Sequence, residues 1–168
     1  DALIVDISHE VEKFNIQHGA LMLWCALPFM PIGAHMAVVD PGVGTNRRPV
    51  AIETARGDYL VGPDNGLLLP GAERLGGITR AHLIENVQYR LPVVSSTFHG
   101  RDLFAPAAAH LALGVPLELI GPEFLQPQPQ WELREFKLTP GSEDPFVANG
   151  QLNMTTVKLT PDAAFNNT

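Results

Sequence analysis

The sequence predicts an α/β fold, with helices on both faces of a largely parallel sheet. Strand-like apolar runs alternate with helical ones through most of the chain, which is the pattern of βα units. Polar and glycine-rich segments follow several of the strand-like runs, where loops leave the sheet. With 168 residues, of which 45% are apolar, the chain can bury one core of ordinary size. We therefore expect an α/β/α domain over residues 1–125 and the start of a small C-terminal β module over residues 126–168.

The N-terminal part is expected to begin with a strand and a helix. Leu3–Val5 is a short apolar run typical of a buried strand. Because this run lies at the first residues, we expect the chain to start in the middle of the fold. Asn15 can cap a helix over Ile16–Leu27, which Pro28 ends.

More strands and helices are expected in the central part. Four apolar runs predict strands, at His35–Val39, Val50–Thr54, Tyr59–Val61 and Ala81–Ile84. Gly57 and Asp58 predict a tight turn between the second and third of these strands. A short helix is expected over Leu69–Leu75, and a longer one over Asp102–Leu113, which Gly114 ends.

The character of the sequence changes after Gly121. Residues 126–130 alternate glutamine and proline, which is typical of an extended linker. Beyond this linker, the alternating patterns of Trp131–Leu138 and Gln151–Leu159 predict strands with one exposed face. These strands would begin the β module.

Composition excludes several classes of function. The net charge of −7 disfavours phosphate backbones, so we expect no nucleic-acid partner and favour a small cationic or zwitterionic molecule. Prolines interrupt the apolar stretch 20–39, which therefore predicts no membrane span. Cys25 is the only cysteine, which indicates a reducing, cytoplasmic location. The six histidines lack the spacing of zinc ligands, so no metal site is expected.

One polar cluster lies across a glycine-rich turn, where Asp40 follows a predicted strand and Arg47 comes seven residues later. Gly42 and Gly44 can give the turn positive φ and let its backbone approach a ligand, while Arg47 can reach back to the carboxylate. The spacing is equally compatible with a structural ion pair that holds the loop.

A second polar cluster, residues 95–102, places His99 on a loop just before a helix. Such a position can shift the pKa of an imidazole and direct it toward a substrate, although a lone histidine is more often a surface or core residue. The serine and threonine hydroxyls of this cluster fit helix capping better than a nucleophile. Asp40, the turn with Asp64 and Asn65, and the His99 loop all follow predicted strands, so we expect them to share one crevice.

Four motifs together resemble the S-adenosylmethionine hydroxide adenosyltransferases, relatives of the fluorinases and chlorinases. The resemblance covers about the first 120 residues. The motifs are Val5-Asp6-Ile7-Ser8-His9-Glu10-Val11, Val38-Val39-Asp40-Pro41-Gly42-Val43-Gly44-Thr45, Gly62-Pro63-Asp64-Asn65-Gly66 and Ser95-Ser96-Thr97-Phe98-His99-Gly100-Arg101-Asp102-Leu103-Phe104-Ala105-Pro106.

The resemblance implies hydrolysis of S-adenosyl-L-methionine to adenosine and L-methionine, without a metal or cofactor. It implies that Asp40, Arg47 and His99 form the catalytic set. By the same resemblance, the substrate-binding residues are Phe14, Asp64, Asn65, Phe98 and Gly100. It further implies a homotrimer with the site at the subunit interface. Phe14 also fits a hydrophobic staple before the first helix.

Differences from the family pattern leave alternatives open. The resemblance implies an earlier first strand and a complete C-terminal β-barrel, neither of which this sequence matches. One alternative is therefore a truncated, catalytically inactive relative that binds a nucleoside or serves as a structural oligomer. Formation of an adenosyl halide is a weaker alternative, because the halogenating relatives carry tyrosine where this chain has Asp40 and His99. A generic hydrolase that uses His99 with Asp102 is weaker still.

Overall fold

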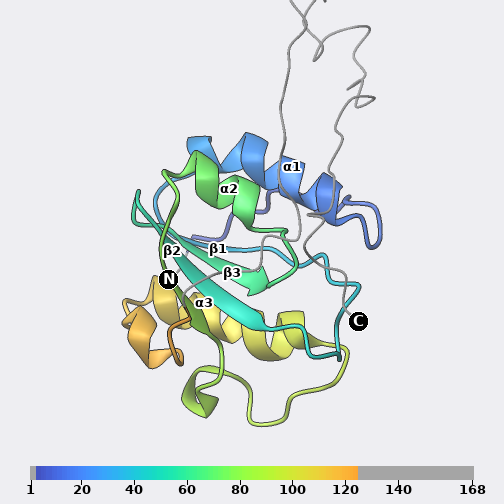
Figure 1. Ribbon diagram of the computed structural model, residues 1–168, viewed down its shortest axis with the longest axis vertical. Helices are drawn as coiled ribbons and strands as arrows, with labels where there is room; N and C mark the ends of the chain where they lie inside the picture. Colours follow the sequence, from blue (N-terminus) through green and yellow to red (C-terminus); the bar gives the residue numbers. More distant parts are fainter. Residues whose placement is uncertain (1–2, 125–168) are drawn as a thin grey trace, which may run out of the picture. The chain divides into compact units, whose positions relative to one another are not determined.

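A mixed sheet of four strands lies at the centre of the computed structural model, which describes residues 3–124 (Figure 1). These residues all belong to one unit, Asp1–Pro129. The strands are β1 (Ala34–Met36), β2 (Pro49–Thr54), β3 (Tyr59–Pro63) and β4 (Ile78–Leu83). They lie in the order β1-β3-β2-β4.

The α/β class is confirmed, but a parallel arrangement is supported only for the pair β1–β3. β2 runs antiparallel to both β3 and β4. The cause is the tight turn between β2 and β3, in which the amide of Gly57 donates to the carbonyl oxygen of Thr54 at 2.9 Å. A turn this short can only join antiparallel neighbours, because a parallel pair needs a long crossover.

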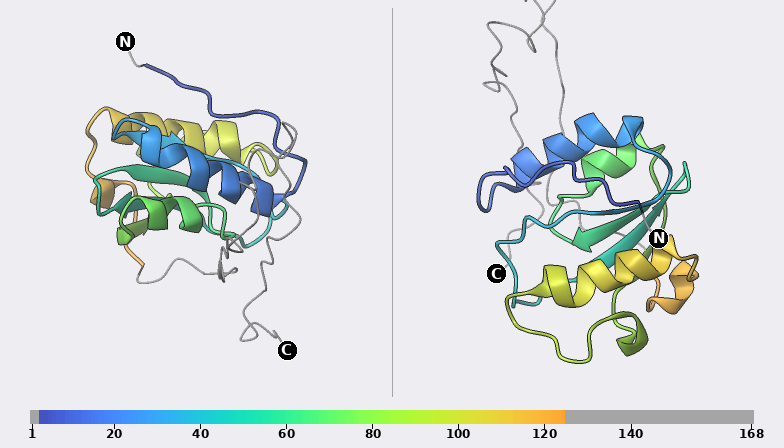
Figure 2. Two further views of the ribbon diagram at one scale, coloured as in Figure 1. Left: turned by 90° about the horizontal axis from the view of Figure 1, so that it is seen from above. Right: turned by 180° about the vertical axis from the view of Figure 1, so that it is seen from behind.

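Helices cover both faces of the sheet in the expected α/β/α layers (Figures 1 and 2). The helices α1 (Ile16–Ala26) and α2 (Leu69–Arg74) lie on one face, and α3 (Ala105–Ala112) lies on the other. Side chains alternate along the strands, so that Ile52 packs with the first pair of helices and Ala51 packs with α3.

The ends of the helices follow local sequence signals. The side chain of Asn15 caps α1 as predicted, accepting a hydrogen bond from the amide of His18 at 2.9 Å. A 3₁₀ turn, Leu27–Phe29, contains Pro28 and follows α1 directly. The helix expected from Asp102 begins earlier, with a π-helical turn over Gly100–Phe104 that leads into α3.

The predicted strand at Leu3–Val5 is wrong. These residues form no strand and pair with none of the four strands of the described sheet. Their side chains are consequently exposed, by 87% for Leu3, 82% for Ile4 and 55% for Val5. An apolar run indicates a strand only if a neighbouring strand supplies its hydrogen-bond partners.

Several predictions concern residues beyond the described range. The linker at 126–130 and the strands at Trp131–Leu138 and Gln151–Leu159 lie outside it.

Over residues 3–124, no helix has both the length and the apolar character needed to cross a bilayer.

The topology gathers the two predicted polar clusters at one end of the sheet. The loops after β1 and β3 and the loop before β2 meet there, because β1 and β3 are parallel and β2 is antiparallel to β3. Figure 1 shows the arrowhead of β3 and the start of α3 on the same side of the molecule.

Candidate active site

A buried ion pair joins the two ends of the loop between β1 and β2. Arg47 donates from Nε to Oδ1 of Asp40 at 3.1 Å and from Nη2 to Oδ2 of the same carboxylate. The Asp40 and Arg47 side chains are only 4% and 7% exposed. Two parallel hydrogen bonds fix both the position and the orientation of the carboxylate. The predicted contact across seven residues is therefore present.

His99 joins this pair through the same guanidinium. Nη2 of Arg47 lies 2.9 Å from Nδ1 of His99. Arginine has no acceptor atom, so Nδ1 must accept this hydrogen bond and the proton of the neutral imidazole must lie on Nε2. Burial, and then the positive charge of Arg47, lower the pKa of His99 below its usual value, although Asp40 and Asp102 partly oppose this shift. The imidazole is therefore neutral at pH 7.

The guanidinium of Arg47 packs against the aromatic ring of Phe104. Cζ of Arg47 lies 5.2 Å from the centroid of this ring, which is fully buried. The arrangement is a cation–π contact inside the protein. Within the described residues, Nη1 of Arg47 is buried and has no hydrogen-bond partner. Phe104 is the last residue of the π-helical turn, and the sequence predicted no role for it at the site.

Close backbone contact holds the two loops together. Gly44 has φ +79°, and a Cβ atom there would lie 2.7 Å from the carbonyl oxygen of Ser96. Gly42, in contrast, has no positive φ, so only one of the two glycines needs the conformation expected for both.

Replacing Gly44 with Ala is therefore expected to destabilise the fold by about 1–3 kcal/mol, because it combines positive φ with a steric clash. Gly42→Ala is the matched control, since its Cβ would approach Thr45 Oγ1 no closer than 3.5 Å. Urea unfolding of both variants measures the difference. Equal effects of the two substitutions would contradict this account of the loop contact.

Asp64 and Asn65 lie at the same end of the sheet, where their side chains form hydrogen bonds with other residues of the chain. Oδ2 of Asp64 accepts from Nε of Arg48 at 2.8 Å. Nδ2 of Asn65 donates to the carbonyl oxygen of Val39 at 2.9 Å, and its Oδ1 accepts from the amide of Leu67 at 3.2 Å. Both side chains thus hold the loop after β3 in place.

The remaining predicted residues contribute apolar surface. Phe98 is 58% exposed and Phe14 is 69% exposed. Phe14 adopts φ +64°, which is rare for an aromatic residue and is often found at functional sites. Its exposure does not fit a hydrophobic staple, which would bury the ring. At Gly100, a Cβ atom would meet only Val38, at 3.7 Å, so space remains beside this residue.

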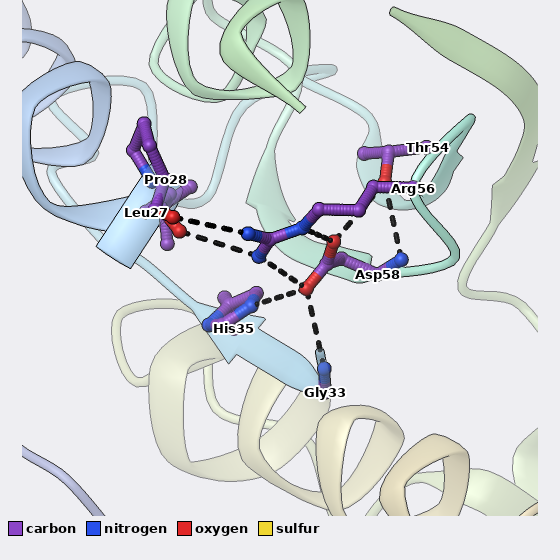
Figure 3. A network of polar contacts seen from close by, with 7 residues as sticks. All are labelled: Leu27, Pro28, Gly33, His35, Thr54, Arg56 and Asp58. Carbon is purple, nitrogen blue, oxygen red and sulfur yellow. Dashed lines mark hydrogen bonds and ion pairs between the residues drawn. The ribbon is translucent and has the colours of Figure 1, made fainter. Parts of the chain in front are cut away.

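A second buried network lies at the opposite end of the sheet, and sequence analysis did not identify it (Figure 3). Asp58 accepts from Arg56 Nε at 2.7 Å, from His35 Nε2 at 2.9 Å and from the amide of Gly33 at 3.2 Å. Arg56 also donates to two carbonyl oxygens of the 3₁₀ turn that follows α1. The network contains Leu27, Pro28, Gly33, His35, Thr54, Arg56 and Asp58. Its polar contacts join distant loops, which indicates a structural role.

Possible metal ligands do not gather in the described region. No group of three or more His, Cys, Asp or Glu side chains within residues 3–124 is placed to hold a metal ion. Hydrogen bonds at the site join a carboxylate, a guanidinium and an imidazole.

Known proteins resemble this chain over its first 121 residues. The model of the SAM hydroxide adenosyltransferase N-terminal domain matches residues 1–121. A protein of Salinispora tropica named (R)-S-adenosyl-L-methionine hydrolase is 50% identical over 119 residues, which cover 71% of this chain and 45% of that protein. A fluorinase of Actinopolyspora mzabensis is 29% identical over 144 residues, which cover 72% of this chain and 48% of the fluorinase.

A solved structure also resembles this chain. The crystal structure of an uncharacterized conserved protein from Thermotoga maritima has a TM-score of 0.73 and 40% sequence identity, and the match covers 80% of this chain and 52% of that one. The chain thus spans about half the length of the relatives it matches. Residues 1–121 match the family model over more than half of the chain, and the protein therefore belongs to the SAM hydroxide adenosyltransferase family.

Proposed function

We propose that the protein hydrolyses S-adenosyl-L-methionine to adenosine and L-methionine. The observation that carries the proposal is the hydrogen-bonded set in which Arg47 contacts both the Asp40 carboxylate and the His99 imidazole from two separate loops. The name of the Salinispora tropica relative supports the same reaction. That relative and a fluorinase share this fold region, and its higher identity favours hydrolysis over halide transfer.

The reaction is displacement at the ribose C5′ atom. The oxygen of a water molecule forms a bond to C5′ while the C5′–S bond breaks, and the electron pair of that bond goes to sulfur. The sulfonium becomes a neutral thioether, and the water loses one proton. Because a sulfonium is already a good leaving group, the protein needs only to position the water in line and accept its proton. This chemistry requires neither a metal nor a cofactor.

The hydrogen bonds suggest distinct roles for the three residues. The oxygens of Asp40 retain acceptor capacity beyond the bonds from Arg47, so the carboxylate can accept the proton of water. Nδ1 of His99 is occupied by Arg47, which leaves Nε2–H as a donor that can orient the water or the substrate. In this account Asp40 is the base, Arg47 fixes it, and His99 positions the nucleophile.

We propose that the substrate lies against the neighbouring surface. The exposed rings of Phe14 and Phe98 can line the ribose, and the space at Gly100 can admit the C5′ carbon. Asp64 and Asn65 would act by shaping the loop after β3, since their side chains already contact Arg48 and Val39. This role is indirect, whereas the sequence predicted direct contact with the substrate.

We further propose a cytoplasmic homotrimer with this site at the subunit interface. The proposal of a trimer rests on the family resemblance, and exposed apolar residues in the segment before His99, such as Phe98 and Val93, are compatible with contact to another subunit. The single thiol of Cys25 suits a reducing compartment, and burial raises its pKa.

The rate should depend on the protonation of His99. A protonated imidazole cannot accept the hydrogen bond from Arg47, so activity requires the neutral form. Because the pKa of His99 is lowered, we expect kcat/KM to remain constant as the pH falls through about 6.5, the usual pKa of histidine, and to decline only at lower pH. A pH–rate profile measures this decline, and the His99→Gln variant should lose it. A decline centred at or above pH 6.5 would argue against the proposed role.

Product analysis tests the proposal against its alternatives. The purified protein is incubated with each sulfonium epimer of S-adenosyl-L-methionine, with and without chloride, and the products are separated. We expect adenosine and methionine in equal amounts. Chloroadenosine would indicate a halogenating enzyme. Binding of adenosine in calorimetry, without release of methionine, would instead support a nucleoside-binding relative.

A further inference from the structure

A buried carboxylate holds the loop that carries His99 and has no role in the proposed reaction. The side chain of Asp102 is fully buried. Its Oδ2 accepts from the amide of Ser95 at 2.8 Å, and its Oδ1 accepts from Nε of Arg101 at 2.6 Å. Nη2 of Arg101 also donates to Oδ2 at 3.2 Å. The carboxylate thus accepts three hydrogen bonds, from one residue before His99 in the sequence and one after it.

The main chain of Asp102 forms two more hydrogen bonds with the same loop. Its amide donates to the carbonyl oxygen of Phe98 at 3.0 Å, and its carbonyl oxygen accepts from the amide of Leu91 at 2.9 Å. Asp102 therefore contacts the segment before His99 at three places, which are Leu91, Ser95 and Phe98. Few conformations of residues 91–102 satisfy all these contacts together.

These contacts reach the catalytic set through two routes. Cζ of Arg101 lies 5.0 Å from the centroid of the Phe98 ring, next to His99. On the other side, Ser96 lies against Gly44, in the loop that carries Arg47. Fixing Ser95 and Phe98 therefore fixes the approach of His99 to Arg47.

We propose that Asp102 is a positioning residue, which holds the imidazole of His99 in place against Arg47. The effect of Asp102 on catalysis rests on the proposed hydrolase function, whereas its effect on the position of His99 does not depend on that function. The charged groups that act on His99 are Arg47 and Asp40 from the facing loop and Asp102 from its own helix. Because the Asp102 oxygens accept from Ser95 and Arg101, the carboxylate acts through the loop and not as a hydrogen-bond partner in a His–Asp dyad.

The Asp102→Asn variant tests the proposal by NMR, without any substrate. The variant keeps the size of the side chain and one acceptor oxygen, but removes the charge. We expect the pKa of His99 to fall, because Asp102 raises it, and the ring ¹⁵N signals of His99 to lose the single Nε2–H tautomer. Asp58→Asn is the matched control, since it removes another fully buried, arginine-bound carboxylate at the opposite end of the sheet. It should leave the His99 signals unchanged.

A second variant keeps the proposal falsifiable if Asp102→Asn does not fold. The Arg101 side chain is 64% exposed, so Arg101→Gln should fold while it removes two of the three hydrogen bonds to the carboxylate. We expect the His99 signals of this variant to lose the single Nε2–H tautomer as well. Unchanged His99 signals in every folded variant at positions 101 and 102 would overturn the proposal, as would an equal change in Asp58→Asn.

Kinetics then connect the placement of His99 to catalysis. If the wild-type protein releases methionine, Asp102→Asn should lower kcat by about 10- to 100-fold through misplacement of His99, while KM stays within about twofold. An unchanged kcat in folded Asp102→Asn would overturn the proposal. If the wild-type protein releases no methionine, the proposed function fails, and the NMR result alone decides whether Asp102 positions His99.

Discussion

Replacing Asp40 with Asn is expected to lower kcat for the release of methionine by about 10²- to 10⁴-fold, the usual contribution of a general base. The amide retains the shape of the carboxylate, but it is a poor proton acceptor, and its NH₂ group replaces one of the two oxygens that accept from Arg47. Steady-state kinetics on S-adenosyl-L-methionine, with circular dichroism to verify folding, measure the effect.

Glu53→Gln is the matched control for Asp40→Asn. Glu53 accepts from Nε of Arg80 at 2.7 Å on the surface of β2, away from the site, and its loss should leave kcat unchanged. A folded Asp40→Asn variant with kcat within twofold of wild type would show that another group accepts the proton.

Replacing Asp58 with Ala is expected to cause the largest loss of stability, about 3–5 kcal/mol in the free energy of unfolding. The substitution leaves Arg56 without its counterion and leaves the amide of Gly33 without its acceptor (Figure 3). Urea denaturation measures the loss. Glu53→Ala, which breaks a more exposed pair with Arg80, should cost less than about 1 kcal/mol.

The effect of Asp58→Ala should also depend on pH. Burial alone would raise the pKa of Asp58, but hydrogen bonds from Arg56, His35 and Gly33 outweigh it and lower the pKa. A carboxylate with a lowered pKa in the folded state stabilises the protein above the ordinary value of about 3.9, and this contribution is lost as the pH falls below it. The difference between wild type and Asp58→Ala should therefore shrink in acid. A constant difference would indicate that packing, and not charge, dominates.

The Asp40–Arg47 contact could be predicted because its determinants are local. Seven residues with a glycine-rich turn between two strand-like runs leave few ways to place the two side chains. His99 could be placed near them because loops at one end of a sheet converge. The tautomer of His99 could not be predicted, since it depends on a hydrogen bond between residues 52 positions apart.

The failed predictions depended on partners that local patterns do not reveal. Leu3–Val5 has the composition of a strand, but pairing decides whether a strand forms. The sheet was expected to be largely parallel although the turn at Gly57 already required an antiparallel pair. The Asp58 network was missed because its partners His35 and Gly33 lie 23 and 25 positions away in the sequence.

Hydrolysis in ¹⁸O-labelled water tests the central claim most directly. If Asp40, Arg47 and His99 direct a water molecule to C5′, mass spectrometry should find ¹⁸O in the 5′-hydroxyl group of the released adenosine. The Asp40→Asn variant should lose this product. Adenosine without the label, or methionine released with no adenosine, would contradict attack of water at C5′.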